Sequence, residues 1–259
     1  MKSGLPCQDY SLDYHDAERT IIACCDGHGG ARYIRSDRGS RFACEAVLNV
    51  FKGLAPSFLY KYKDKEAEDR IRMELLCEWN KLVERDIANH PFTKKELESL
   101  SEDDREALML NRAKAYGTTM TGALLLSGKL VVAGIGDSEC LLINKGEAER
   151  PLERESDPAG NITYSLCQDD AYSYIRAAVV NFYQYDGVVL CTDGFSGPYQ
   201  SYENMKESFL KPLVKKTLWG RSAEQVHEFV GLLAEKKGTG DDVSIAYIID
   251  GSASIKHYE

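Results

Sequence analysis

The stretch that decides the fold is residues 117–147, which read GTTMTGALLLSGKLVVAGIGDSECLLINKGE. It holds three apolar runs, and the turns between them carry glycine. Short apolar runs that alternate with glycine-bearing turns predict consecutive antiparallel strands. Because these strands follow one another without a helix between them, the pattern is not that of a repeating strand–helix–strand fold.

The chain before this stretch predicts one strand and several helices. Residues 19–25 (RTIIACC) predict a short buried strand that ends at a glycine-rich loop. Residues 40–52 and 66–90 carry apolar side chains at helical spacing, and the second segment is the strongest helix prediction in the chain. Thr93 and Glu96 have the spacing of a capping box, so another helical stretch, with a solvated acidic face, is expected to begin there.

The chain after this stretch predicts a flap, two strands, two helices and a last strand. Residues 146–173 are polar and irregular, and they predict a loop or flap. The two strands, in 172–183 and 186–194, are expected to be joined by a tight turn at Gln184–Gly187. The helices are expected at about 202–217 and at 223–237, and the strand in DDVSIAYIID at 241–250.

This order of elements is typical of the α+β class, with antiparallel sheets flanked by helices. Neither a linker nor an internal repeat divides the 259 residues, so a single domain over residues 1–259 is expected.

Composition narrows the possible functions. The formal net charge of −9 disfavours general binding to nucleic acid or to anionic membranes, and it suits a site that collects divalent cations. The sequence has neither an apolar run of transmembrane length nor the apolar core of a signal peptide, which predicts a cytoplasmic protein. The eight cysteines form no Cys-x-x-Cys pair, so they are expected to be reduced, structural thiols.

Aspartates stand at the ends of the predicted strands. The set is Asp9, Asp26, Asp137, Asp193, Asp241 and Asp242. A single Asp-Gly pair is most simply a turn, but so many acids at strand boundaries are hard to assign to turns alone. Carboxylates gathered at one rim of a sheet repel one another unless a cation neutralises them. Oxygen ligands indicate Mg²⁺ or Mn²⁺, and two such ions would form a binuclear site for hydrolysing phosphate esters.

His28 stands between glycines in CCDGHGG, residues 24–30. One interpretation is an ordinary surface histidine in a glycine-rich loop. The other is a general acid beside a metal-bound phosphate, because the pKa of an ordinary histidine lies near neutral pH.

Five motifs in one order give the chain a resemblance to a known family. They are DGHGG at 26–30, YGTTMTGALL at 116–125, GIGDSE at 134–139, CTDGF at 191–195 and GDDVSI at 240–245. Together they closely resemble the metal-dependent protein phosphatases of the protein phosphatase 2C type, and GLPCQDYS at 4–11 is similar to the bacterial branch. The resemblance implies a four-layer α-β-β-α sandwich. It also implies hydrolysis of phosphoserine and phosphothreonine in protein substrates by a water that bridges two Mn²⁺ or Mg²⁺ ions, in opposition to a serine/threonine kinase.

The resemblance also implies roles for individual residues. Asp26 would bridge both ions, and the carbonyl of Gly27 would bind one of them. Asp193 and Asp241 would hold the other ion, and Asp9 would support the first mainly through water. Asp137 would help to bind a third ion more weakly, and His28 would donate a proton to the leaving group. Gly117, Thr118 and Thr119 would have a structural role at the start of a strand.

One departure and two rival functions accompany this interpretation. Many family members carry Glu-Asp where this chain has Gln8-Asp9, so weaker or differently hydrated binding of the first ion is expected. The first rival is a phosphatase-like domain that binds or senses phosphoproteins with little or no turnover. The second is a metal phosphoesterase that acts on small molecules or nucleic acid, and the acidic composition disfavours nucleic acid.

Overall fold

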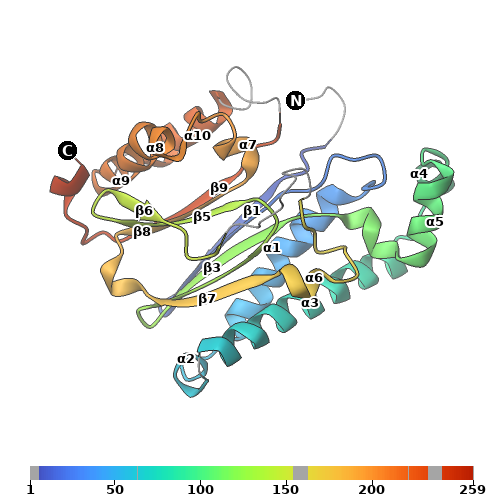
Figure 1. Ribbon diagram of the computed structural model, residues 1–259, viewed down its shortest axis with the longest axis horizontal. Helices are drawn as coiled ribbons and strands as arrows, with labels where there is room; N and C mark the ends of the chain where they lie inside the picture. The colour runs from blue at the N-terminus through green and yellow to red at the C-terminus, as the bar shows by residue number, and fades with distance from the viewer. Residues whose placement is uncertain (1–5, 63, 154–162, 221, 233–240, 259) are drawn as a thin grey trace.

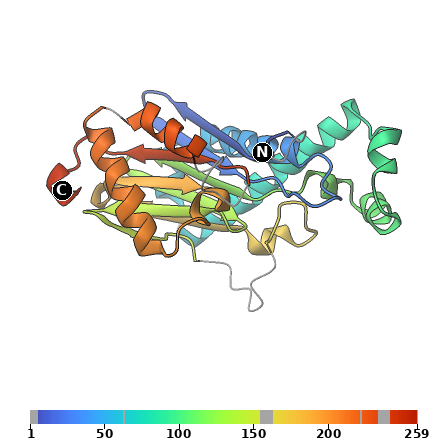
Figure 2. The same cartoon turned by 90° about the horizontal axis from the view of Figure 1, so that it is seen from above.

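Two antiparallel β-sheets stack face to face, and helices cover the outer face of each (Figure 1, Figure 2). The structure, a computed structural model, describes residues 6–62, 64–153, 163–220, 222–232 and 241–258. The layers run helix, sheet, sheet, helix, which confirms the α-β-β-α sandwich expected from the resemblance.

The first sheet has five strands. In spatial order they are β1 (Tyr10–His15), β2 (Arg19–Cys25), β3 (Met120–Leu126), β4 (Lys129–Ile135) and β7 (Arg176–Asn181). The strands predicted at 19–25 and within 117–137 are confirmed. The β3–β4 hairpin turns at Ser127 and Gly128, which both have positive φ, the conformation of a tight hairpin turn. The edge strand β1 was not predicted, because its side chains are mostly exposed and polar and give no apolar run.

The second sheet has four strands, which in spatial order are β6 (Glu147–Glu149), β5 (Glu139–Asn144), β8 (Gly187–Cys191) and β9 (Ile245–Ile249). Two expected pairings are therefore wrong. β4 and β5 follow each other in sequence but lie in different sheets, as do β7 and β8, which are joined through a 3₁₀ turn, η2 (Phe182–Gln184). Both sheets bury apolar side chains, so the sequence pattern does not show where the chain crosses between them.

Two boundaries also differ from the expectation. The last strand begins at Ile245, so Asp241 and Asp242 lie in the loop before it. The segment 146–173, expected to be a loop or flap, contains β6 and most of a short helix, α6 (Ala171–Tyr174). Residues 154–162 of that segment lie outside the described residues.

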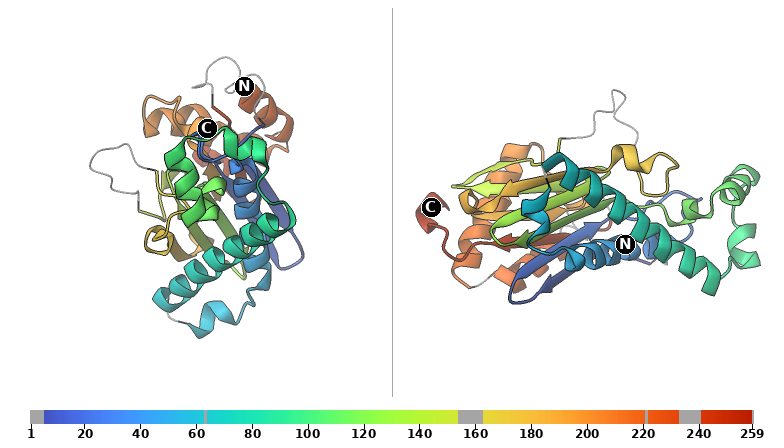
Figure 3. Two further views of the ribbon diagram at one scale, coloured as in Figure 1. Left: turned by 90° about the vertical axis from the view of Figure 1, so that its right-hand side faces the viewer. Right: turned by 90° about the horizontal axis from the view of Figure 1, so that it is seen from below.

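Two long helices cover the five-stranded sheet, α1 (Ser36–Gly53) and α3 (Asp64–Asn89), and both confirm predicted helices. The Thr93 capping box is present, with the Glu96 N–H donating to Thr93 Oγ1 at 3.2 Å, but its helix is short. A second N-cap at Ser101 starts another helix, whose first turn holds the acidic run. The shorter helices on this side are α2 (Phe58–Lys61), α4 (Lys94–Glu98), α5 (Glu102–Leu110) and η1 (Arg112–Tyr116). Figure 3 shows α4 and α5 extending beyond the end of the sheets.

The outer face of the four-stranded sheet is covered by the C-terminal helices. They are α7 (Asp193–Ser196), α8 (Tyr202–Met205), η3 (Lys206–Leu210), α9 (Lys211–Leu218), α10 (Ser222–Leu232) and η5 (Ile255–Tyr258). The helix expected at 202–217 is a continuous path through α8, η3 and α9, in which η3 is a π-helical turn. The helix expected at 223–237 is described as far as Leu232.

The core has three apolar layers, one at each interface of the sandwich. Trp79 and Phe51 are fully buried between the helices and the five-stranded sheet. Val132 and Leu190 pack between the sheets, and Phe209 packs under the C-terminal helices. Among the described helices, none is both long and apolar enough to cross a membrane. All eight cysteines are free thiols, and those in the strands are buried, as expected for structural thiols.

Candidate metal centre

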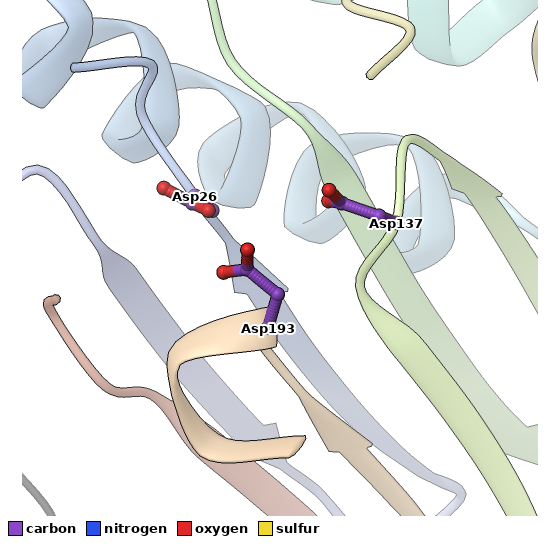
Figure 4. A group of neighbouring side chains, drawn as sticks. All are labelled: Asp26, Asp137 and Asp193. Atoms are coloured by element: carbon purple, nitrogen blue, oxygen red, sulfur yellow. The ribbon is translucent and has the colours of Figure 1, made fainter. Parts of the chain in front are cut away.

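Three aspartates meet at one end of the sandwich. Asp26, Asp137 and Asp193 each place a carboxylate oxygen within 4.8 Å of the others, and Figure 4 shows the three side chains around one space. Asp26 directly follows β2, Asp137 lies just past β4, and Asp193 begins α7 after β8. Because β2 and β4 belong to one sheet and β8 to the other, the site lies where the two sheets meet. The three are predicted metal ligands, and the structure brings them together.

The backbone of Asp26 is fixed by the two threonines predicted to be structural. The Thr119 N–H and the Thr118 hydroxyl both donate to the Asp26 carbonyl at 2.8 Å, and the Asp26 N–H donates to Thr119 Oγ1 at 3.0 Å. The next residue, Gly27, packs so closely that a Cβ there would lie 2.7 Å from the carbonyl oxygens of Gln8 and Ser36. The carboxylate of Asp26 therefore projects from a rigid backbone.

Asp9 lies buried beside this group. Its carboxylate accepts a hydrogen bond from Thr192 Oγ1 at 2.7 Å, and its side chain is 8% exposed. Burial raises the pKa of Asp9, and the hydrogen bonds oppose that rise. Burial and then the charges of Asp9 and Asp193 also raise the pKa of Asp26. Without a cation, these acids must hold protons or repel one another, so their oxygen atoms fit a hard divalent ion.

The other two predicted acids lie in the loop before β9. Burial is the main cause that raises the pKa of Asp193, and the charges of Asp137 and Asp241 add to it. Asp241 therefore lies near the centre, although it is not within the 4.8 Å group. Asp242 accepts a hydrogen bond from the Gln8 N–H at 2.6 Å, which ties this loop to the N-terminal segment.

His28 lies beside the same group. Its backbone N–H donates to the Gly117 carbonyl at 3.0 Å, and its ring packs against Tyr33 with ring centroids 4.9 Å apart. Burial lowers the pKa of His28, and the charge of Asp137 opposes this. The ring is therefore neutral over a wider pH range than an exposed histidine.

Two polar residues of the site were not singled out as functional by the sequence. Thr192, directly before Asp193, holds Asp9. Gln8, read only as a missing charge, acts as a clamp, because its side-chain amide donates to Ser36 Oγ at 2.6 Å and to the His28 carbonyl at 3.2 Å. In the sequence, the feature that could have indicated Thr192 and Gln8 is that each directly precedes a predicted metal ligand.

A buried polar network supports the start of α1 beside the site. The Tyr116 hydroxyl donates to Asp86 and accepts from Arg35, both at 2.7 Å. Arg35, which is 4% exposed, also pairs with Glu96 at 2.7 Å. This network fixes the residue before Gly117 and thereby the strand start that holds Asp26.

Comparison with known proteins identifies the family and the fold. The sequence model of protein phosphatase 2C matches residues 1–231. Among the solved structures that resemble the chain are three protein phosphatases. The first, a bacterial serine phosphatase, is 17% identical with a TM-score of 0.62, covering 98% of this chain and 96% of that one. The second is the serine/threonine phosphatase Stp1 from Staphylococcus aureus, 15% identical with a TM-score of 0.58, covering 96% and 91%.

The third is the catalytic domain of the serine/threonine protein phosphatase PstP in complex with two manganese ions. It is 19% identical with a TM-score of 0.58, covering 95% of this chain and 91% of that one. At these identities the structural likeness shows the fold. No curated protein sequence matches the chain. The sequence match spans most of the chain, and it shows that the chain belongs to the protein phosphatase 2C family and is a phosphoprotein phosphatase.

Proposed function

We propose that the chain is a metal-dependent serine/threonine protein phosphatase with two Mn²⁺ or Mg²⁺ ions at the aspartate group. The observation that carries the proposal is the approach of Asp26, Asp137 and Asp193 within 4.8 Å, with the pKa of Asp26 and of Asp193 raised by burial and by neighbouring acids. PstP, a neighbour in fold, is described with two manganese ions, which supports the choice of metal.

The residues present fit such a centre. The charges of both Asp9 and Asp193 act on Asp26, so Asp26 is near each of them and would be the ligand shared by two ions, with the Gly27 carbonyl as a further ligand of one. Asp193 and Asp241 would hold the second ion, and Asp137 would help to hold a third ion that binds more weakly. When bound, the ions supply an activated water and neutralise the charge of the phosphoryl oxygens.

The protein's own residues hold the Asp26 carboxylate in position and supply a proton to the leaving oxygen. The threonines behind Asp26 keep its carboxylate in place, which removes reorganisation from the reaction. We assign to His28 the proton that the leaving seryl or threonyl oxygen takes up. Its lowered pKa leaves the free ring neutral, and the negative charge of a bound phosphoryl group favours the protonated ring.

Substrate and context are part of the proposal. The substrate would be a phosphorylated protein, in opposition to a serine/threonine kinase, and a single catalytic domain would span residues 1–259. The fold matches to the three neighbours each cover 95% or more of this chain, which supports that extent. The cytoplasmic location stays a prediction.

The test is hydrolysis of p-nitrophenyl phosphate and of a phosphothreonine peptide, with and without Mn²⁺. The substitution is Asp193→Asn, and the matched control is Asp103→Asn on the exposed face of α5. We expect Mn²⁺-dependent turnover that Asp193→Asn lowers about 100-fold or more, because charge stabilisation by the ions is lost. Binding of a phosphopeptide without turnover at saturating Mn²⁺ would instead identify the non-catalytic rival.

A further inference from the structure

The ring of His28 makes no hydrogen bond among the residues that the structure describes, although its backbone is held at both polar groups. The backbone N–H donates to the Gly117 carbonyl at 3.0 Å, and the His28 carbonyl accepts from the Gln8 side-chain amide at 3.2 Å. The last torsion of a histidine side chain has a broad energy minimum, so a fixed backbone does not by itself fix the direction of the ring. A ring that delivers a proton to one oxygen atom therefore needs another contact that sets its orientation.

That contact is the ring of Tyr33. Its centroid lies 4.9 Å from the centroid of the His28 ring, and the two planes meet at 58°. Both rings lie against Gly117, because a Cβ at that position would be 2.3 Å from Tyr33 Cδ1 and 2.9 Å from His28 Cδ2. The opposite edge of the Tyr33 ring lies against Gly30, where a Cβ would be 3.1 Å from Cδ2. Glycine at both positions lets the backbone approach the ring that contacts His28.

Tyr33 is itself held in place. Its backbone N–H donates to the Gly30 carbonyl at 2.9 Å, and its carbonyl accepts from the Ser36 N–H at 3.1 Å, at the start of α1. Its side chain packs against the apolar layer between the helices and the five-stranded sheet. The Tyr33 hydroxyl has no hydrogen bond within the described part of the chain, so the contact with His28 depends on the flat ring.

We propose that Tyr33 is a positioning residue for the phosphatase reaction, because its ring holds the His28 ring in the direction in which it donates a proton to the leaving oxygen. The inference rests on the proposed function, which assigns that proton to His28. It adds a residue outside the metal centre, and it gives Gly30 and Gly117 a shared purpose. Proton donation occurs in the transition state, so loss of the ring should lower kcat and leave KM nearly unchanged.

The test uses two substrates that differ in their need for a proton. A seryl or threonyl alkoxide is a strong base and takes up a proton as it leaves, whereas p-nitrophenolate is a stable anion that leaves without one. Values of kcat and KM are measured at saturating Mn²⁺ for a phosphothreonine peptide and for p-nitrophenyl phosphate. In Tyr33→Ala we expect kcat for the peptide to fall about tenfold or more relative to kcat for p-nitrophenyl phosphate, because the proton donor is misplaced.

Two variants keep what the inference says is needed. Tyr33→Phe retains the ring and should behave as the wild-type protein. Tyr183→Ala is the control for loss of a tyrosine, because that side chain is 83% exposed. Tyr33→Leu keeps much of the apolar volume but removes the flat ring, so it should show the same selective loss as Tyr33→Ala, and it provides the test if Tyr33→Ala fails to fold.

A double variant distinguishes positioning of His28 from a general structural role. His28→Ala should lower the ratio of peptide to p-nitrophenyl phosphate turnover by about 100-fold or more, the usual contribution of a general acid. In the His28→Ala background, Tyr33→Ala should lower that ratio no further, because no imidazole is left to position.

The outcomes separate the inference from the proposed function. Equal losses for the two substrates in Tyr33→Ala, the wild-type ratio in Tyr33→Leu, or a Tyr33→Phe variant as impaired as Tyr33→Ala would each overturn the inference. An unchanged ratio in His28→Ala would remove the proton from His28 and the inference with it, while Mn²⁺-dependent hydrolysis of both substrates by the wild-type protein still upheld the phosphatase. Absence of hydrolysis of either substrate by the wild-type protein would remove the proposed function itself.

Discussion

Replacing Asp26 by asparagine should have opposite effects on the metal-free and the metal-loaded protein. The backbone of Asp26 is held by Thr118 and Thr119, so the substitution changes only the side chain. Asparagine keeps the shape and removes one charge from the group of acids. The apoprotein should therefore become more stable, and the stabilisation by Mn²⁺ and the activity should both be lost.

The magnitude follows from the distances. Two unit charges 4.8 Å apart repel by about 3.5 kcal/mol at an effective dielectric constant of 20. A bound proton relieves part of this, so we expect Asp26→Asn to stabilise the apoprotein by about 2 kcal/mol, or about 4–8 °C in melting temperature. The gain should grow with pH. Because the pKa of Asp26 is raised, the folded apoprotein keeps a proton that the unfolded chain loses above about pH 4, and wild-type stability falls as the pH rises from there through the raised pKa.

The assay is thermal unfolding of both proteins in chelator and in Mn²⁺, at several pH values. Wild-type protein should gain about 2.7 kcal/mol at a Mn²⁺ concentration of 100 times Kd, and the variant should gain little. If Asp26→Asn lowers the stability of the apoprotein at pH 8, the carboxylate is held by its hydrogen bonds, and the reasoning from charge repulsion is refuted.

Two further substitutions test other parts of the structure. Gly194→Ala would place a Cβ 2.0 Å from the Asp242 carbonyl oxygen, so the loop before β9 must move. We expect a loss of about 1–3 kcal/mol and a higher Mn²⁺ requirement in a titration of activity, and wild-type behaviour would contradict the packing. Glu96→Gln removes a carboxylate whose pKa is lowered to about 2, chiefly by its hydrogen bond from Arg35. Its contribution of about 1–3 kcal/mol should be present above pH 4.5 and disappear as the pH falls to 2, as measured by denaturant unfolding, whereas a difference that is constant with pH would exclude this ion pair.

The sequence predicts local elements well, because their signals are local. Ile71, Leu75 and Trp79 recur at helical spacing and are all fully buried on one side of α3. The assignment of strands to sheets could not be read in the same way. The turn after β4 has glycine and polar residues like a hairpin turn, yet Gly136, at φ +95, lies where the chain passes to the other sheet.

The same distinction holds for the site: residues with a local sequence signal could be predicted, and contacts between distant residues could not. Asp26, Asp137 and Asp193 could be found because each ends an apolar strand beside a glycine, and several such ends point to a single rim. The hydrogen bond from Thr192 to Asp9 joins positions 183 residues apart, and no local pattern contains it.

The placement of the acids on both sheets has a consequence for the lifetime of the folded protein. Asp26 follows a strand of one sheet, Asp193 follows a strand of the other, and Asp137 lies in the connection between the two sheets, so an ion held between them would join the sheets at that end. Neither sheet could offer this ligand set alone, and the set is complete only after the two have docked. Interactions that form after the folding transition state slow unfolding more than they speed folding. Metal supply would therefore set how long each folded molecule persists, in addition to whether it is active.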